Sequence, residues 1–153
     1  MKIVITRVSS ASVTVENEVV GSIEKGILAL VGICKDDTKE DLEYIIKKLI
    51  NIRLWADPKT NKPWSSSVKS LGLPVLLISQ FTLFARTKKG NKPDFHLAMG
   101  AEKSSPMFEN FCKRVGEELG DQNKVQQGVF GAMMKVESIN DGPVTITIDS
   151  KNR

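Results

Sequence analysis

Apolar and polar residues alternate along the first part of the chain in the pattern typical of β-strands. The alternation covers residues 2–9 and resumes over residues 12–16. Residues 19–23 follow a short polar turn and are predicted to pair with the strand before it. Residues 27–33 are almost continuously apolar, which is typical of a strand buried on both faces. The chain is therefore predicted to begin with a group of neighbouring strands.

Two later segments carry apolar residues at the spacing of an amphipathic helix. The first follows Thr38, a predicted N-cap with an aspartate three positions on, and its apolar stripe covers residues 42–52. The second is predicted to have Ser105 and Pro106 in its first turn and to end at Gly120. Both stripes are interpreted as core packing.

The rest of the pattern contains one surface loop and three more strands. Residues 57–67 combine prolines, an asparagine and three serines, which predicts a surface loop, and we expect Trp64 to anchor it. Residues 75–78 form a second buried strand, and residues 134–139 and 144–149 alternate. Strands and helices in this order predict an α+β fold, with residues 1–153 as a single domain.

Composition narrows the class of protein. A chain of 153 residues with 41% hydrophobic and 26% charged residues is typical of one globular domain, and no apolar run is long enough to span a membrane. The N-terminus shows no leader pattern, so we expect a cytoplasmic location. Cys34 and Cys112 lack metal-ligand spacing and are interpreted as buried free thiols. A formal charge of +4 favours polyanions only mildly.

Conventional catalytic groups are poorly represented. The single histidine, His96, has no recognisable nucleophile motif to serve, and one histidine with two scattered cysteines predicts neither a metal site nor a metal cofactor. The polar pair at residues 79–80 stands out because it ends a buried strand, and Thr82 follows it. Such a strand end is either a hydrogen-bonded terminus or a site that uses hydroxyl and backbone groups.

Two further segments allow more than one interpretation. Residues 140–143, Asn-Asp-Gly-Pro, lie between alternating strands and are typical of a hairpin turn, but a Gly-Pro bond also takes the cis form at low cost. The basic residues that follow the Ser-Gln pair form either a solvated loop or a contact for RNA phosphates. They are Arg86, Lys88, Lys89 and Lys92.

Two motifs give the chain a resemblance to a known family. The sequences Ser-Gln-Phe-Thr-Leu at residues 79–83 and Asn-Asp-Gly-Pro-Val at residues 140–144 resemble the Ser-Gln and Gly-cisPro motifs of the D-aminoacyl-tRNA deacylases. Residues 6–8, 89–95 and 130–134 are similar to that family as well, and the likeness extends along nearly the whole chain. The resemblance implies a compact, β-rich, barrel-like domain with two main helices packed on the sheets.

The resemblance also implies a function. It implies a homodimeric ester hydrolase, with no cofactor, that acts on the 3′ end of D-aminoacyl-tRNA and of mischarged glycyl-tRNA, assisted by the 2′-hydroxyl of the terminal adenosine. A Gly-cisPro unit of the partner subunit would reject L-amino acids. The implied catalytic segment is Ser79, Gln80, Phe81 and Thr82; the implied substrate-binding residues are Phe130, Met134 and Arg7; the implied chirality filter is Gly142 and Pro143.

Three points stay open at the level of sequence. Thr82 is either a nucleophile or an orienting group, because nothing near it in the sequence activates its hydroxyl. A catalytically silent RNA-binding module that uses the basic loop is one alternative function. A hydrolase of small esters that depends on Thr82 is another.

Overall fold

The computed structural model of the chain describes residues 1–88 and 90–153, so Lys89 of the basic loop lies outside the described residues. The strands are β1 (Lys2–Val15), β2 (Glu18–Ile23), β3 (Gly26–Gly32), β4 (Val75–Ser79), β5 (Val125–Gln127) and β6 (Lys135–Asp149). The helices are α1 (Lys39–Asn51), α2 (Val68–Leu71) and α3 (Ala101–Leu119), with short 3-10 helices η1 (Phe81–Phe84) and η2 (Gln122–Lys124).

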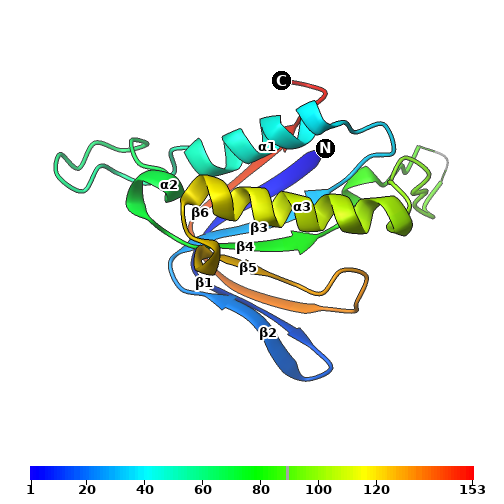
Figure 1. Cartoon of the computed structure of the whole chain (residues 1–153), viewed down its shortest axis with the longest axis horizontal. Helices are drawn as coiled ribbons and strands as arrows, with labels where there is room; N and C mark the ends of the chain where they lie inside the picture. The colour runs from blue at the N-terminus through cyan, green and yellow to red at the C-terminus, as the bar shows by residue number, and fades with distance from the viewer. Residues whose placement is uncertain (89) are drawn as a thin grey trace.

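All of these strands belong to one curved sheet. Its order is β2-β1-β3-β4-β5, and β6 pairs with β1 as well. The sheet curls until its two edges approach: a Cβ atom added to Gly21 of β2 would lie 3.0 Å from the carbonyl oxygen of Gln127 in β5. The predicted α+β, barrel-like architecture with two main helices is confirmed (Figure 1).

The first predicted boundary is wrong, because residues 2–9 and 12–15 lie in one strand, which ends before Glu16. β1 continues through Ser10 and Ala11 without a turn. Its first half pairs with β3 and its second half with β2, while β6 follows it along most of its length. A strand that changes partners in this way bends the sheet, and its register shifts against β6 mark the bend.

Residues 135–139 and 144–149 likewise lie in one strand, which begins after Met134, so the hairpin interpretation is wrong. Thr6 of β1 pairs with Thr145, and Val8 pairs with Asn140. Residues 141–144 therefore stand opposite Arg7 alone, and they form a wide bulge within β6 instead of a turn between two strands.

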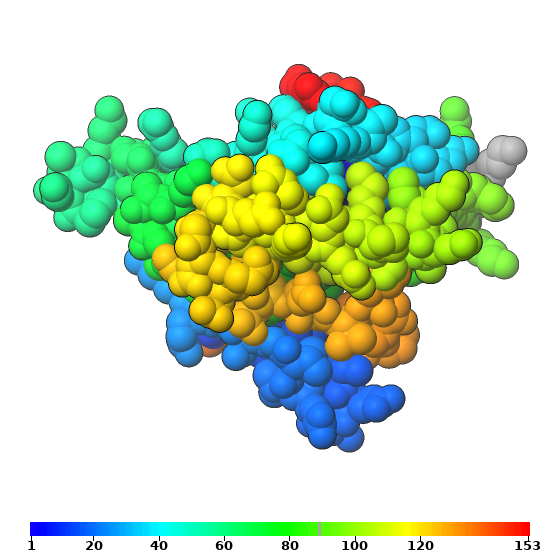
Figure 2. Space-filling view, in the orientation of Figure 1, coloured from blue at the N-terminus to red at the C-terminus, as the bar shows by residue number. Residues whose placement is uncertain are grey.

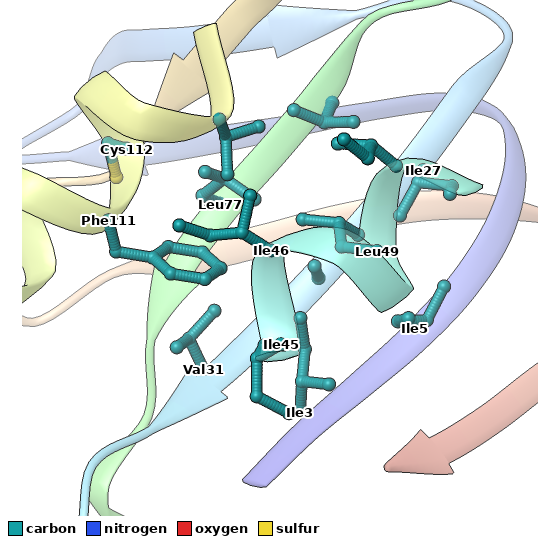
Figure 3. Packing of buried hydrophobic residues seen from close by; sticks show 14 of the residues in the cluster. Ile3, Ile5, Ile27, Val31, Ile45, Ile46, Leu49, Leu77, Phe111 and Cys112 are labelled. Carbon is teal, nitrogen blue, oxygen red and sulfur yellow. The ribbon is translucent and has the colours of Figure 1, made fainter. Parts of the chain in front are cut away.

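The main core lies between one face of the sheet and the two long helices. Figure 3 shows Ile45, Ile46 and Leu49 of α1 facing Ile3 and Ile27 of the sheet, with side chains of α3 packed beside them. The predicted stripes of both helices are buried as expected, except that Ile52 and Leu119 are half-buried. A second, smaller cluster, which includes Val13, Leu28 and Ile78, fills the other side of the sheet.

Helix α3 begins earlier than its proline predicts. Its first residue is Ala101 and its N-cap is Gly100, so Pro106 lies inside the helix and not in its first turn. The hydroxyl of Ser104 donates to the carbonyl oxygen of Gly100 at 3.1 Å and secures the start. A proline at this depth removes one backbone hydrogen bond, which the packed helix tolerates. The predicted stop at Gly120 is confirmed by its left-handed backbone.

The expectation that Trp64 anchors residues 57–67 is also wrong. Trp64 is 57% exposed, whereas the neighbouring Trp55 is 6% exposed and packs into the core. Cys34 and Cys112 are buried and free, as predicted, and burial raises the pKa of the Cys112 thiol to about 12. None of the helices in the described residues is long and apolar enough to cross a membrane.

Candidate functional site

The polar end of β4 is built by the parallel pairing of β3 and β4. Ser79, the last residue of β4, lies in register with Val31 of β3. The next backbone N–H, that of Gln80, donates to the carbonyl oxygen of Val31 at 2.8 Å. The chain then turns into η1, which leaves Phe81 and Thr82 exposed. The sequence-predicted segment thus forms a strand-to-helix corner at the surface.

The Gln80 and Thr82 side chains contact each other at this corner. The Gln80 amide nitrogen Nε2 donates to Thr82 Oγ1 at 2.6 Å. Phe81 is 55% exposed and packs edge-on against Phe95, with 5.1 Å between ring centroids. Sequence reasoning did not single out Phe95 for this contact, because nothing in the local pattern links it to Phe81.

Phe130 and Met134 lie beside the same strand end. The backbone N–H of Gly128 donates to the carbonyl oxygen of Leu77 at 3.1 Å, which ties this segment to β4 two residues before Ser79. A Cβ atom on Gly128 would lie 2.5 Å from the Met134 sulfur. Phe130 packs against Phe108 of α3 with 6.1 Å between ring centroids. The structure thus places Met134 beside β4 and Phe130 against α3, whereas Arg7, the third predicted substrate-binding residue, lies at Asp141 of β6.

A cavity opens on the other side of η1. Its volume is about 390 Å³, and Leu83 of η1 contributes to its wall. The rest of the wall comes from the first residues of β1, the last residues of β6 and Asn152 beyond β6. These lining residues are Lys2, Ile3, Val4, Thr147, Ile148, Asp149 and Asn152. The cavity thus reaches η1 only through Leu83.

Gly142 and Pro143 are exposed at the bulge of β6, and the peptide bond between them is cis. Arg7 supports the bulge from β1. Its Nε donates to the carbonyl oxygen of Asp141 at 3.2 Å and lies 3.1 Å from the Asp141 carboxylate, while its Nη1 donates to the carbonyl oxygen of Leu54. Sequence reasoning missed Leu54, whose contribution is a main-chain atom that carries no sequence signal.

The structure does not bring the two motifs together within the chain. Arg7, which stands opposite the bulge, pairs with Ile27 of β3, whereas Ser79 pairs with Val31 of the same strand. Four residues along a strand correspond to about 13 Å. The Gly-Pro bulge and the Ser-Gln corner therefore point from opposite ends of the sheet.

The basic loop stays close to η1. Backbone hydrogen bonds of 2.8 and 2.9 Å join Arg86 to Asp94 and close the loop, and Lys88 and Lys92 are exposed. His96 is 90% exposed at its side chain, and its ring contacts the Asp94 carboxylate. Its backbone N–H lowers the pKa of Asp94. The contacts of His96 are thus to its own loop and not to Thr82.

These features define a class of protein: a small α+β fold with a nearly closed sheet, a polar corner at one end and a projecting bulge at the other. The chain belongs to the D-Tyr-tRNA(Tyr) deacylase family, whose family model matches residues 4–149. It is 48% identical over 153 residues to proteins named D-aminoacyl-tRNA deacylase from Dictyostelium discoideum and from Flavobacterium psychrophilum. The alignments cover 100% of this chain and at least 99% of each relative.

Solved structures support the same fold. The structure described as c-Myc DNA Unwinding Element Binding Protein is 42% identical, with a TM-score of 0.91 over 97% of this chain and 98% of that one. A probable eukaryotic D-amino acid tRNA deacylase superposes with a TM-score of 0.83 over 96% of this chain and 97% of that one. At 17% identity, this second likeness concerns the fold alone.

Proposed function

We propose that the protein hydrolyses the ester bond that joins a D-amino acid to the terminal adenosine of tRNA. The observation that carries this proposal is the family match over residues 4–149, together with full-length relatives named for this activity. The exposed Phe81 and Thr82 of the corner support it, because a flexible tRNA 3′ end needs an accessible site. Acting on charged tRNA would place the protein in the cytoplasm.

The proposed chemistry uses little side-chain catalysis. Water attacks the ester carbonyl carbon, the bond to the adenosine 3′ oxygen breaks, and that oxygen takes a proton as it leaves. The 2′-hydroxyl of the same adenosine assists the proton transfer. Thr82 is an orienting group in this scheme, because its oxygen accepts from the Gln80 amide, and an amide is not a base.

Main-chain groups of the corner would hold the reacting carbonyl. Leu83 donates the first internal hydrogen bond of η1, to the carbonyl oxygen of Gln80 at 3.3 Å. The N–H groups of Phe81 and Thr82 come before that bond, at the start of the helix, where backbone donors are available to a ligand. Donors held in this way stabilise the negative charge that develops on the carbonyl oxygen. Ser79 and Gln80 would position the aminoacyl-adenosine, and Phe130 and Met134 would line its pocket.

The Gly142-Pro143 bulge is the proposed chirality filter. Its carbonyl groups would occupy the space that an L side chain needs, so that D-amino acids and glycine fit while L-amino acids are rejected. The three contacts of Arg7 support this role, since they fix the bulge to β1 and to residue 54. Mischarged glycyl-tRNA would be a second substrate for the same reason.

The filter would act on the partner subunit of a homodimer. Within one subunit the bulge lies about 13 Å along the sheet from the level of Ser79. Exposed apolar side chains near the bulged strand support association, because Ile139 is 64% exposed and Met133 is 93% exposed. A two-fold dimer presents each bulge to the other subunit's corner.

The basic loop would contact the tRNA backbone. Its basic residues are Arg86, Lys88, Lys89 and Lys92.

The direct test is to compare the enantiomers of one charged tRNA. We expect purified protein to release D-tyrosine from D-tyrosyl-tRNA and to spare L-tyrosyl-tRNA. Equal cleavage of both enantiomers would contradict chiral selection. Salt-sensitive tRNA binding without turnover would favour the silent RNA-binding module. Cleavage of simple esters that needs no tRNA and is abolished in Thr82→Ala would favour the small-ester hydrolase.

A further inference from the structure

Trp64 is exposed on a protruding loop that has no role in the proposed function. The Trp64 loop, residues 57–65, joins α1 to α2 and extends away from the body of the molecule (Figure 2). Trp64 is 57% exposed and has a left-handed φ of 54°. A bulky side chain seldom adopts this backbone conformation, and it persists only where the surrounding structure imposes it.

Hydrogen bonds fix the loop before any ligand arrives. The Asp57 carboxylate accepts the backbone N–H groups of Lys59 and Thr60, both at 2.8 Å, and these bonds lower the pKa of Asp57. At the base, Trp55 pairs with Ser66 through backbone hydrogen bonds of 2.9 and 3.1 Å. The tryptophan is thus displayed on a rigid support, which reduces the entropy lost when a partner binds.

The charge around Trp64 is basic. Lys59 and Lys62 are exposed, and neither forms an ion pair with any other residue in the ranges 1–88 and 90–153. The acidic residue closest to Trp64 in the sequence, Asp57, is already bound by the loop's own N–H groups. An exposed aromatic ring beside unpaired lysines is the arrangement that binds single-stranded nucleic acid, through base stacking and phosphate contacts.

The position of the loop connects it to the Gly-Pro bulge. The Leu54 carbonyl just before the loop accepts from Arg7, which also holds Asp141. The loop therefore lies at the bulge end of the subunit, away from its own Ser79 corner. If the bulge enters the partner's corner, the Trp64 loop lies beside that same corner.

We propose that the Trp64 loop of one subunit binds the unpaired 3′ nucleotides of the tRNA whose ester is held by the partner subunit. Trp64 stacks on a base upstream of the terminal adenosine, and Lys59 and Lys62 contact the adjoining phosphates. This inference rests on the proposed function, because it needs both a tRNA substrate and a bulge that acts across the dimer.

The test compares a full tRNA substrate with one that lacks the upstream nucleotides. For Trp64→Ala and for the Lys59→Ala/Lys62→Ala variant, we expect KM for D-tyrosyl-tRNA to rise about tenfold at unchanged kcat. KM for D-tyrosyl-adenosine should stay unchanged, because that substrate does not reach the loop. Trp64→Phe is the matched control, since phenylalanine keeps a stacking face and should stay within about twofold of wild type.

Fluorescence supplies a readout that does not depend on turnover. Uncharged tRNA should quench the emission of the wild-type protein, since Trp64 is exposed while Trp55 is buried. The quenching should disappear in Trp64→Phe although the RNA still binds. If tRNA quenches the emission of the wild-type protein but the protein does not cleave D-tyrosyl-tRNA, the proposed function is contradicted, while the contact between Trp64 and RNA is not.

Three results would overturn the inference. One is an unchanged KM for D-tyrosyl-tRNA in Trp64→Ala while the wild type is active. Another is an equal loss with D-tyrosyl-adenosine, which would place Trp64 at the ester site. The third is dissociation of Trp64→Ala into monomers in sedimentation, which would assign the tryptophan to the contact between subunits.

Discussion

The hydroxyl of Thr82 illustrates how a single contact separates two mechanisms. A nucleophilic threonine needs a base to remove its hydroxyl proton. Substitution of such a threonine lowers the rate by several orders of magnitude. In this structure Thr82 Oγ1 accepts a 2.6 Å hydrogen bond from the Gln80 amide. The contact suits a residue that orients its neighbour.

We therefore expect Thr82→Ala to retain deacylation of D-tyrosyl-tRNA within about tenfold of the wild-type kcat, because it loses one orienting hydrogen bond worth about 1 kcal/mol. Single-turnover kinetics would measure this. Thr82→Ser, which keeps the hydroxyl, is the matched control and should behave like wild type. A loss of a thousandfold or more in the alanine variant alone would restore the nucleophile.

Gly142 is a residue at which a methyl group has no room. Its φ is 122°, and an added Cβ would lie 2.9 Å from the backbone nitrogen of Val144 and 3.3 Å from Arg7 Nη2. We expect Gly142→Ala to displace the bulge and to increase cleavage of L-tyrosyl-tRNA relative to the D-enantiomer. Parallel assays of both enantiomers would measure the ratio.

Gly120→Ala is the control for Gly142→Ala. Gly120 also has a positive φ, of 72°, but a Cβ there would contact nothing within 4 Å. We expect that variant to lower stability by about 1 kcal/mol and to leave chirality unchanged. A chirality ratio that shifts equally in both variants would show a general effect of destabilisation.

At the scale of elements, the start of α1 is joined to the C-terminal end of the chain. Asp41 is 3% exposed and accepts from the Thr38 backbone at 2.9 Å and from Lys151 at 2.6 Å. Hydrogen bonds from Lys151, Ser150 and Thr38 outweigh burial and hold the Asp41 pKa well below its ordinary value. A capping residue thus also links two distant segments.

This linkage predicts how stability depends on pH. Because the folded pKa of Asp41 is depressed, its contribution is complete above the unfolded pKa near 4 and is lost as the pH falls below it. Asp41→Asn should lower the free energy of unfolding by about 2 kcal/mol at pH 7, and the deficit should shrink below pH ~4. Urea denaturation across this range would measure it. Glu102→Gln, in the exposed first turn of α3, should change stability by less than about 0.5 kcal/mol at every pH.

At the scale of the whole molecule, the proposed dimer, in which the bulge of one subunit serves the corner of the other, predicts complementation between subunits. Gln80→Ala subunits, which lack a side chain proposed to position the aminoacyl-adenosine, should lose most of their activity but carry an intact bulge, whereas Gly142→Ala subunits should cleave both enantiomers. When Gln80→Ala is added in excess, mixed dimers should place an intact bulge in the Gly142→Ala pocket. Cleavage of L-tyrosyl-tRNA should then fall while cleavage of D-tyrosyl-tRNA persists.

The control for that mixture is the double variant Gln80→Ala/Gly142→Ala, which offers no intact bulge and should restore no selectivity. Unchanged L-cleavage in mixtures whose subunits have exchanged, as followed by mass spectrometry, would contradict a filter that acts across the dimer.

Much of the fold was predictable from the sequence because local pattern and burial agree. The stripe along α1, the buried runs of β3 and β4 and the stop at Gly120 all follow from periodicity and backbone preference. The start of α3 was predicted too late because Pro106 was placed in its first turn, whereas packing of the helix offsets the cost of a proline in the second turn. Trp64 was wrongly expected to anchor its loop, because a large apolar residue is usually buried, whereas this one is exposed.

The sequence by itself determined the family, the two motifs and the alternation that builds the sheet. Only the tertiary structure decided that β1 and β6 are each continuous, because the bulge opposite Arg7 depends on register between segments more than 130 residues apart. It also placed the Ser-Gln corner and the Gly-Pro bulge at opposite ends of the sheet. Such placement arises from strand pairing over long distances in the chain, which no local pattern encodes.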